Sequence, residues 1–202
     1  MDAEFQLTDI HFSVLKEIGN IGAGNAATSL SGLLGRKIDM NVPKVQILTL
    51  KQTGEALGGA ELPVAAVLVS LKSENVNGIM MFVVELDRTN GLISALIGEN
   101  RTEMGELEQS ALQEIGSILT ASYLGALSTF LDVKIDRSVP TLAIDMAGAI
   151  LSLPAIEFAK VSDNTLFIES VFQSEANDVS GYFILVPDQE SFEFIFHKLG
   201  LQ

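Results

Sequence analysis

The side chains in this sequence that are able to do chemistry are carboxylates, amides and hydroxyls. The 202 residues include no cysteine, which excludes a disulfide scaffold, a thiolate zinc site and a cysteine nucleophile. The two histidines, His11 and His197, are far apart in the sequence, and neither has a second plausible ligand nearby, so we expect no metal site. The remaining candidates are polar residues that recur at helical spacing.

Ser13, Glu17 and Asn20 have the spacing that would bring them together on a helix. At 100° per residue, their side chains lie within about 60° of one another. The apolar residues of the same segment centre roughly 140° away, so that they would face a core while the three polar residues face outward. On its own, an exposed carboxylate with an amide one turn away is usually no more than a solvated helix face.

A second copy of this pattern lies 97 residues further along the chain. Without a gap, Ser13–Pro43 aligns with Ser110–Pro140, and 14 of the 31 aligned positions are identical. Chance would give roughly two matches, so the chain contains an internal duplication. The copy has Ser110, Glu114 and Ser117 at the matching positions. Because duplicated surface positions are free to drift, a carboxylate kept in both copies favours a functional role.

Both halves predict the same order of elements. Each has a long helix, then a strand that begins at Ile38 or Ile135 and runs through the proline, then two β-rich segments and a closing helix. The long helices are expected at about 10–35 and 104–132, the β-rich segments at about 62–72, 77–85, 164–174 and 180–187, and the closing helices near 88–98 and 188–199. Thr8 or Asp9 would cap the first helix.

The second half contains one further predicted helix, over Asp145–Val161, which we expect to be broken at Pro154. Helices that alternate with hairpins indicate an α+β fold with pseudo-two-fold symmetry. No Pro/Ser-rich linker separates the halves. We therefore expect a single domain over 1–202, made of two fused repeats at about 8–100 and 104–201.

The glycine-rich run Gly19–Ala27 has two interpretations. Its Gly-Ala-Gly-x-x-Ala string superficially matches a dinucleotide-binding loop, but such a loop needs a strand before it and a helix that opens at the glycines. Here a helical pattern precedes the glycines. The alternative is a surface of small residues on which another helix packs closely, and we favour it.

Composition and charge exclude several classes of partner. The 12 Lys and Arg against 26 Asp and Glu give a net charge of −14, which disfavours binding to nucleic acid or to an anionic membrane surface. No apolar run approaches the ~20 residues of a membrane span. The acidic start Met1-Asp2-Ala3-Glu4 does not resemble a secretory signal, so we expect a soluble, cytoplasmic protein. The two halves could bury against one another what a homodimer would bury, which favours a monomer.

The motif residues together resemble the CheC/CheX/FliY family of chemotaxis phosphatases. The family pattern Asp/Ser-x3-Glu-x2-Asn-x22-Pro is complete here as Ser13-x3-Glu17-x2-Asn20-x22-Pro43, and it recurs from Ser110 to Pro140 with Ser117 in place of the Asn. The resemblance extends over essentially the whole chain. It implies a CheC-like fold in which a six-stranded, mainly antiparallel sheet carries the two motif helices side by side on one face.

The resemblance also implies a function. The expected substrate is phosphorylated CheY, whose aspartyl phosphate would be hydrolysed, and Mg²⁺ would be held by CheY, so that this chain needs no cofactor of its own. Asn20 would hold the attacking water, and Glu17 would pair with a lysine of CheY, with Ser13 and Ser110 as further binding residues. At the second site, Glu114 would still bind, while Ser117 is shorter than Asn and would support weak hydrolysis or none.

Two alternatives from other functional classes remain. The chain could be an adaptor for CheD, a receptor deamidase that relatives bind, and the candidate contact is then Asp145 beside the apolar residues Met146, Ile150 and Leu151. Asp145 could equally be only the cap of the predicted helix. The other alternative, a non-catalytic component of the flagellar switch, is weakened by the intact pair of Glu17 and Asn20.

Overall fold

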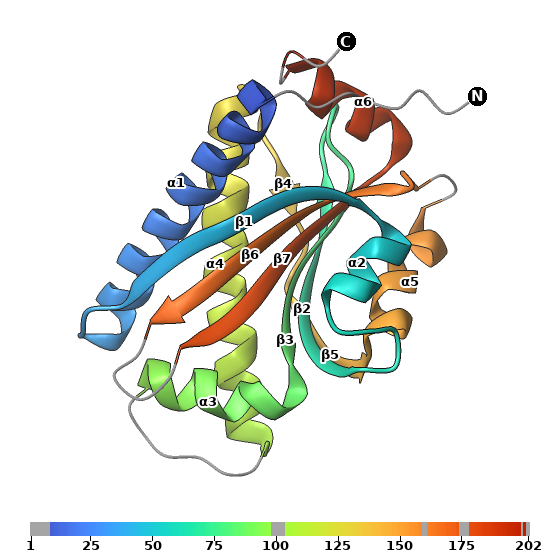
Figure 1. The fold of residues 1–202 in the computed structure, drawn as a ribbon. Coiled ribbons are helices and arrows are strands. Elements are labelled where there is room, and N and C mark those ends of the chain that lie inside the picture. Colours follow the sequence, from blue (N-terminus) through green and yellow to red (C-terminus); the bar gives the residue numbers. More distant parts are fainter. Residues whose placement is uncertain (1–8, 98–103, 159–160, 174–177, 199, 201–202) are drawn as a thin grey trace.

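The chain folds into a sheet with helices on both faces (Figure 1). A computed structural model describes residues 9–97, 104–158, 161–173, 178–198 and 200. The helices are α1 (Asp9–Leu34), α2 (Leu50–Ala56), α3 (Leu86–Ile97), α4 (Glu106–Leu131), α5 (Ala147–Glu157) and α6 (Gln189–Lys198). The strands are β1 (Asp39–Thr49), β2 (Pro63–Lys72), β3 (Gly78–Glu85), β4 (Asp136–Arg137), β5 (Thr141–Met146), β6 (Asn164–Gln173) and β7 (Val179–Pro187). The α+β class is confirmed, and α1 begins at Asp9, while Thr8 lies outside the described residues.

The strand order reflects the duplication. The sheet runs β1-β6-β7-β3-β2-β4, β5 also pairs with β2, and all of these pairings are antiparallel. From the centre outward, β7 corresponds to β3, β6 to β2, and β1 to β4 with β5. The strand after each long helix therefore pairs with the hairpin of the other half, so the two halves exchange their outer strands.

The described residues form seven strands rather than the six that the resemblance implies. The strand expected from Ile135 through Pro140 is divided into β4 and β5, which both pair with β2. At the break, Ser138 N donates to Ser70 O at 2.9 Å, while Ser70 N donates to Ser138 Oγ at 3.0 Å. A side chain thus replaces one backbone acceptor, and Pro140 has no N–H for the ladder. β1 passes Pro43 with a shift of register instead.

Each face of the sheet has its own hydrophobic core. The long helices α1 and α4 lie side by side on one face, and α2 and α5 cover the other (Figure 1). Alternate residues of β2 enter the two cores, so that Val67 packs under the long helices while Ala66 and Leu68 pack on the opposite face. Burial on both faces explains why β2 is a continuous apolar run in the sequence.

The short helix α2 was not among the predicted elements, although its start has a recognisable signal. Thr49 and Gln52 form a capping box, in which Gln52 N donates to Thr49 Oγ1 at 3.2 Å and Thr49 N donates to Gln52 Oε1 at 2.9 Å. The pattern Thr-x-x-Gln after a strand thus marks the start of this helix.

The helix α5 corrects the prediction of a break at Pro154. It is shorter than expected, ending at Glu157, but it continues through the proline. Pro154 is buried on the same helix face as Ala147, Ile150 and Leu151. Its apolar ring therefore contributes to the core, which offsets the backbone hydrogen bond that proline cannot donate.

Candidate functional site

The outer face of α1 carries the three residues of the first motif. Ser13, Glu17 and Asn20 are all exposed, whereas Leu15 and Ile18 are 1% and 3% exposed and belong to the core under the long helices. The helical period separates these two sets, as the sequence predicts. The structure thus brings the carboxylate, the amide and the hydroxyl together on one accessible surface.

The second motif has the same arrangement on α4, with one difference. Ser110 and Glu114 are exposed, and Leu112 and Ile115 are buried beneath them. Ser117, however, is only partly exposed. The residue that replaces the amide is therefore both shorter than Asn and less accessible than its counterpart on α1.

Small residues allow the two motif helices to pack closely. A Cβ on Gly22 would lie 2.8 Å from Tyr123 Cδ1, so α1 approaches α4 directly over the tyrosine ring. The predicted small-residue contact is thus confirmed at Gly22, whereas Gly19 packs against Val42 of β1 instead. A dinucleotide-binding loop is excluded, because the glycines lie in the middle of a continuous helix.

The two motifs lie at opposite ends of this helix pair. α1 and α4 run antiparallel (Figure 1), and Gly22 and Tyr123 mark the level at which they meet. With a rise of 1.5 Å per residue, Glu17 lies about 7.5 Å before Gly22, and Glu114 lies about 13.5 Å before Tyr123. The two carboxylates are therefore separated by about 20 Å along the helices, which makes two distinct surfaces rather than one shared site.

Tyr123 anchors α4 to the sheet between the two surfaces. Its hydroxyl shares a buried hydrogen bond of 2.6 Å with Ser170 of β6, and its ring stacks on Phe183 with the centroids 3.9 Å apart. Burial raises the pKa of Tyr123 to about 12, and the hydrogen bond to Ser170 lowers it by less. In the folded protein the phenol therefore stays neutral at pH values well above its ordinary pKa.

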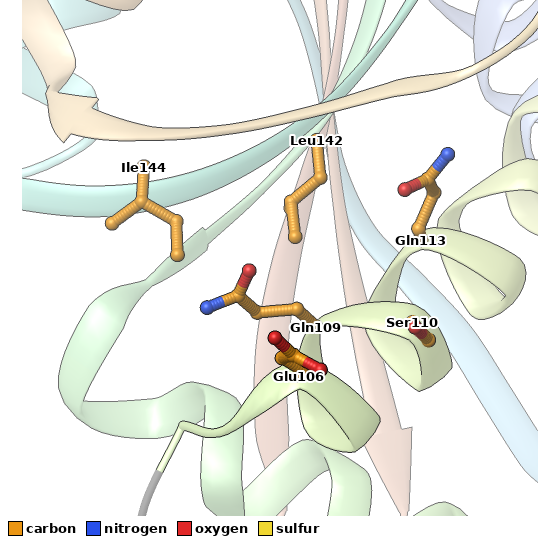
Figure 2. A pocket seen from close by; sticks show the side chains of 6 residues that line it. All are labelled: Glu106, Gln109, Ser110, Gln113, Leu142 and Ile144. Carbon is orange, nitrogen blue, oxygen red and sulfur yellow. The ribbon is translucent and has the colours of Figure 1, made fainter.

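A groove of about 550 Å³ lies beside the second motif, between α4 and β5; we call it the α4–β5 groove. It is lined by Glu106, Gln109, Ser110, Gln113, Leu142 and Ile144. Figure 2 shows Leu142 and Ile144 pointing from β5 toward the polar side chains of α4. This groove was not predictable from the sequence, because its two walls meet only through the packing of β5 and α4.

The proline of the second motif contacts this groove through its backbone. Gln113 Nε2 donates a hydrogen bond of 2.9 Å to the carbonyl oxygen of Pro140. This contact joins the motif helix to the segment between β4 and β5. It fixes the position of the Gln113 side chain next to Glu114.

Asp145 lies elsewhere than predicted. It belongs to β5 rather than to a helix, and its Oδ1 accepts a hydrogen bond of 2.7 Å from Met146 N, while Met146 itself occupies the cap position of α5. Asp145 and Met146 are exposed, but Ile150 and Leu151 are buried. The expected apolar surface beside Asp145 is therefore reduced to Met146 and the neighbouring strand residues.

The described residues contain no sign of a metal centre or a membrane-spanning helix. No three His, Asp or Glu side chains among the described residues are grouped as ligands for a metal ion. None of the helices that the structure describes is both long and apolar enough to cross a membrane. The polar groups at the two candidate surfaces are the side chains of Ser13, Glu17 and Asn20 on α1 and their counterparts on α4.

Comparison with known proteins matches both motif segments. The model of the CheC-like family matches residues 10–47 and 107–144, two segments that are offset by the same 97 residues as the internal repeat. The chain is 35% identical over 194 residues to the "CheY-P phosphatase CheC" of Bacillus subtilis, a match that covers 93% of this chain and 92% of that protein. It is 30% identical over 142 residues to the "Flagellar motor switch phosphatase FliY" of the same organism, covering 68% of this chain and 36% of FliY.

A solved structure gives the same result. The crystal structure of Thermotoga maritima FliY superposes with a TM-score of 0.72 and 25% sequence identity, covering 96% of this chain and 98% of that chain. The duplicated motif, the exchanged strands and the long match to a curated relative agree with one another. This chain belongs to the CheC-like family.

Proposed function

We propose that this protein is a phosphatase that hydrolyses the aspartyl phosphate of the response regulator CheY, and that Asn20 positions the attacking water. The observation that carries the proposal is the exposure of Glu17 and Asn20 together on one face of α1, within a segment that the CheC-like family matches. The Bacillus subtilis relative is a CheY-P phosphatase, which supports the choice of substrate.

In the proposed reaction this chain forms no covalent bond to the phosphoryl group. Water attacks the phosphorus in line, the bond between phosphorus and the aspartate oxygen breaks, and inorganic phosphate leaves while the aspartate of CheY is restored as a carboxylate. Asn20 suits the positioning role, because its amide oxygen accepts a hydrogen bond from water and its NH₂ donates one. We propose that CheY holds the Mg²⁺ that neutralises the phosphoryl charge. This chain then supplies no cofactor of its own.

Glu17 is proposed to fix the register of the complex. It lies one turn before Asn20 and is exposed, so it is able to pair with a lysine of CheY while Asn20 reaches the phosphoryl group. Ser13, one turn earlier on the same face, would extend this contact surface. Positioning of this kind is sensitive, since an error of about 1 Å can cost about 100-fold in rate.

The surface on α4 is proposed to bind without efficient catalysis. Glu114 is exposed as Glu17 is, but Ser117 offers a hydroxyl that is shorter than the amide and only partly exposed. We propose that the protein acts as a cytoplasmic monomer in which the first site accounts for nearly all turnover.

Hydrolysis of freshly phosphorylated CheY tests the proposal. Phosphate release would be followed for the wild type, for Asn20→Ala and for Asn25→Ala, an exposed asparagine on the same helix that serves as the matched control. We expect Asn20→Ala to lose about 100-fold or more in rate and Asn25→Ala to keep the wild-type rate. No acceleration by the wild type would contradict the phosphatase assignment, and full activity of Asn20→Ala would contradict the assignment of the site.

The second candidate function is that of an adaptor for CheD. It is supported by the exposed carboxylate of Asp145 beside the exposed Met146, at the end of the strand β5. If CheD binds there, Asp145→Lys should abolish binding to CheD and leave phosphate release from CheY unchanged. A non-catalytic role in the flagellar switch would instead leave both the wild type and Asn20→Ala without phosphatase activity.

A further inference from the structure

The α4–β5 groove has no role in the hydrolysis proposed above. We propose that it receives a lysine or arginine side chain of a CheY molecule bound at Glu114, so that the second half of the chain is a docking site. The identity of the partner rests on the function proposed above. The chemistry of the groove rests on the side chains that line it.

The polar wall of the groove offers hydrogen-bond acceptors. Glu106 contributes a carboxylate. Gln113 donates one N–H of its NH₂ group to the Pro140 carbonyl at 2.9 Å, which orients the amide, and its amide oxygen is available to accept a hydrogen bond from a ligand. A basic side chain matches these groups, because its charged end carries only donors.

The opposite wall is apolar. Leu142 and Ile144 face the polar side chains across the groove (Figure 2). Lysine and arginine combine a charged end with an apolar stem, and the stem commonly lies along exposed aliphatic surface. A carboxylate on one wall and two aliphatic side chains on the other therefore select this class of side chain over an anion or a purely apolar group.

A neighbouring hollow of about 490 Å³ has the same character. It shares Gln109 and Ile144 with the groove and also includes Asp87 and Asn90. The side-chain oxygen of Asn90 is shielded from solvent and has no hydrogen-bond partner among the described atoms. No Lys or Arg is among the described residues that line either hollow. The two hollows thus contain the carboxylates of Glu106 and Asp87 without a cationic side chain among their described lining residues, which favours a cationic group from a partner.

The groove is continuous with the second motif. Ser110 is both the first residue of that motif and part of the groove lining. Gln113 directly precedes Glu114 and lies one helical turn before Ser117. A protein that contacts Glu114 therefore also covers the groove.

The first half has different chemistry at the matching positions. Counting back 97 residues, Phe12 stands in place of Gln109 and Lys16 in place of Gln113, and both are exposed on α1. A lysine at position 16 would repel a basic side chain of a partner. The cation-accepting groove is therefore a property of the half that lacks the catalytic amide, which fits a division between a catalytic surface on α1 and a docking surface on α4.

Binding measurements on the full chain with a weakened first site test this inference. The Glu17→Ala variant would weaken the first site, and titration calorimetry with Bacillus subtilis CheY activated by beryllofluoride would then measure binding at Glu114. In that background we expect Glu106→Gln to raise Kd about fivefold, the size of one exposed charge contact. Gln113→Lys, which copies the first half, should raise Kd further. Glu190→Gln removes an equal charge from α6 and should leave Kd unchanged.

The outcomes separate this inference from the proposed function. Unchanged Kd values for both Glu106→Gln and Gln113→Lys, in chains with wild-type circular dichroism, would overturn the groove assignment even if the wild type hydrolyses phosphorylated CheY. Absence of CheY binding in the Glu17→Ala background would also overturn it. Binding of CheD in place of CheY, with the same dependence on Glu106, would assign the groove to another occupant and reject the one proposed here. Absence of phosphate release with the wild type would contradict the proposed function alone, not the groove assignment.

Discussion

Gly22 of α1 lies directly against the ring of Tyr123 of α4. A Cβ on Gly22 would be 2.8 Å from Tyr123 Cδ1 and 3.1 Å from Tyr123 Cα. Because Cα belongs to the backbone, the tyrosine cannot relieve this contact by rotating its side chain. Tyr123 is in turn held to β6 by its hydrogen bond to Ser170. This contact sets how α1 lies on α4, and hence how the two motif surfaces are placed relative to each other.

Gly22→Ala should therefore destabilise the fold, although alanine is the better helix former. We expect a loss of about 1–3 kcal/mol in the free energy of unfolding, because the added methyl group overpacks a backbone contact. Gly24→Ala is the matched control, since no atom lies within 4 Å of its Cβ position, and it should gain up to about 1 kcal/mol. Urea unfolding of the two variants measures the difference, and equal stabilities would contradict the packing described here.

The buried phenol of Tyr123 predicts a loss of stability at alkaline pH. Its pKa is raised from 10.0 to about 12 in the folded protein, so the folded state holds the proton more tightly than the unfolded state does. The contribution of the neutral phenol to the free energy of unfolding is fully present below pH 10. It is lost as the pH rises from 10 to about 12, by about 3 kcal/mol in total.

The Tyr123→Phe variant isolates this effect. It should lose about 1 kcal/mol at neutral pH, because Ser170 is left without its buried partner, yet it should lack the loss between pH 10 and 12. Both chains should also carry Tyr182→Phe, since burial raises the pKa of that second tyrosine too. Parallel curves of stability against pH for the two proteins would refute the assignment to Tyr123.

Local patterns were sufficient to predict much of this fold. The helical spacing of Leu15 and Ile18, and the apolar runs of the two hairpins, locate α1, α4 and the four central strands within a few residues. The exchange of outer strands was not predictable in the same way. The pairing of β1 with β6, as of Val45 with Ile168, joins residues that are distant in sequence, and no local signal specifies it.

The same distinction between local and long-range structure applies to the candidate site. Glu17 and Asn20 were predictable because one helix is enough to bring them together. The α4–β5 groove was not, because Gln109 and Ile144 meet only after β5 has paired with β2. Asp145 was misplaced for a related reason, since a residue before an apolar helical pattern can end a strand as readily as it can cap a helix.

Glu17 should contribute to binding rather than to the chemical step. If it pairs with a lysine of CheY, Glu17→Gln should raise KM about fivefold and leave kcat nearly unchanged, as expected for an exposed ion pair. Raising the ionic strength should reduce the difference between the variant and the wild type. Steady-state phosphate release at several salt concentrations measures both effects, and a large fall in kcat would instead place Glu17 at the reacting atoms.

Ser117→Asn tests whether the second surface lacks only the amide. Glu114 is exposed there as Glu17 is on α1, and the helix beneath has the same pattern of buried Leu112 and Ile115. If positioning of water is the missing function, Ser117→Asn placed in an Asn20→Ala background should restore at least about 10-fold in rate over Asn20→Ala alone.

Full recovery is not expected, because position 117 is only partly exposed and the neighbouring groove differs from the surface of α1. Ser117→Gln provides the matched control, since it supplies the same amide one methylene further from the backbone and should restore less. Equal rates for the Asn and Gln variants would show that amide chemistry alone is sufficient, and no recovery by either would mean that the docking geometry at α4 differs from that at α1.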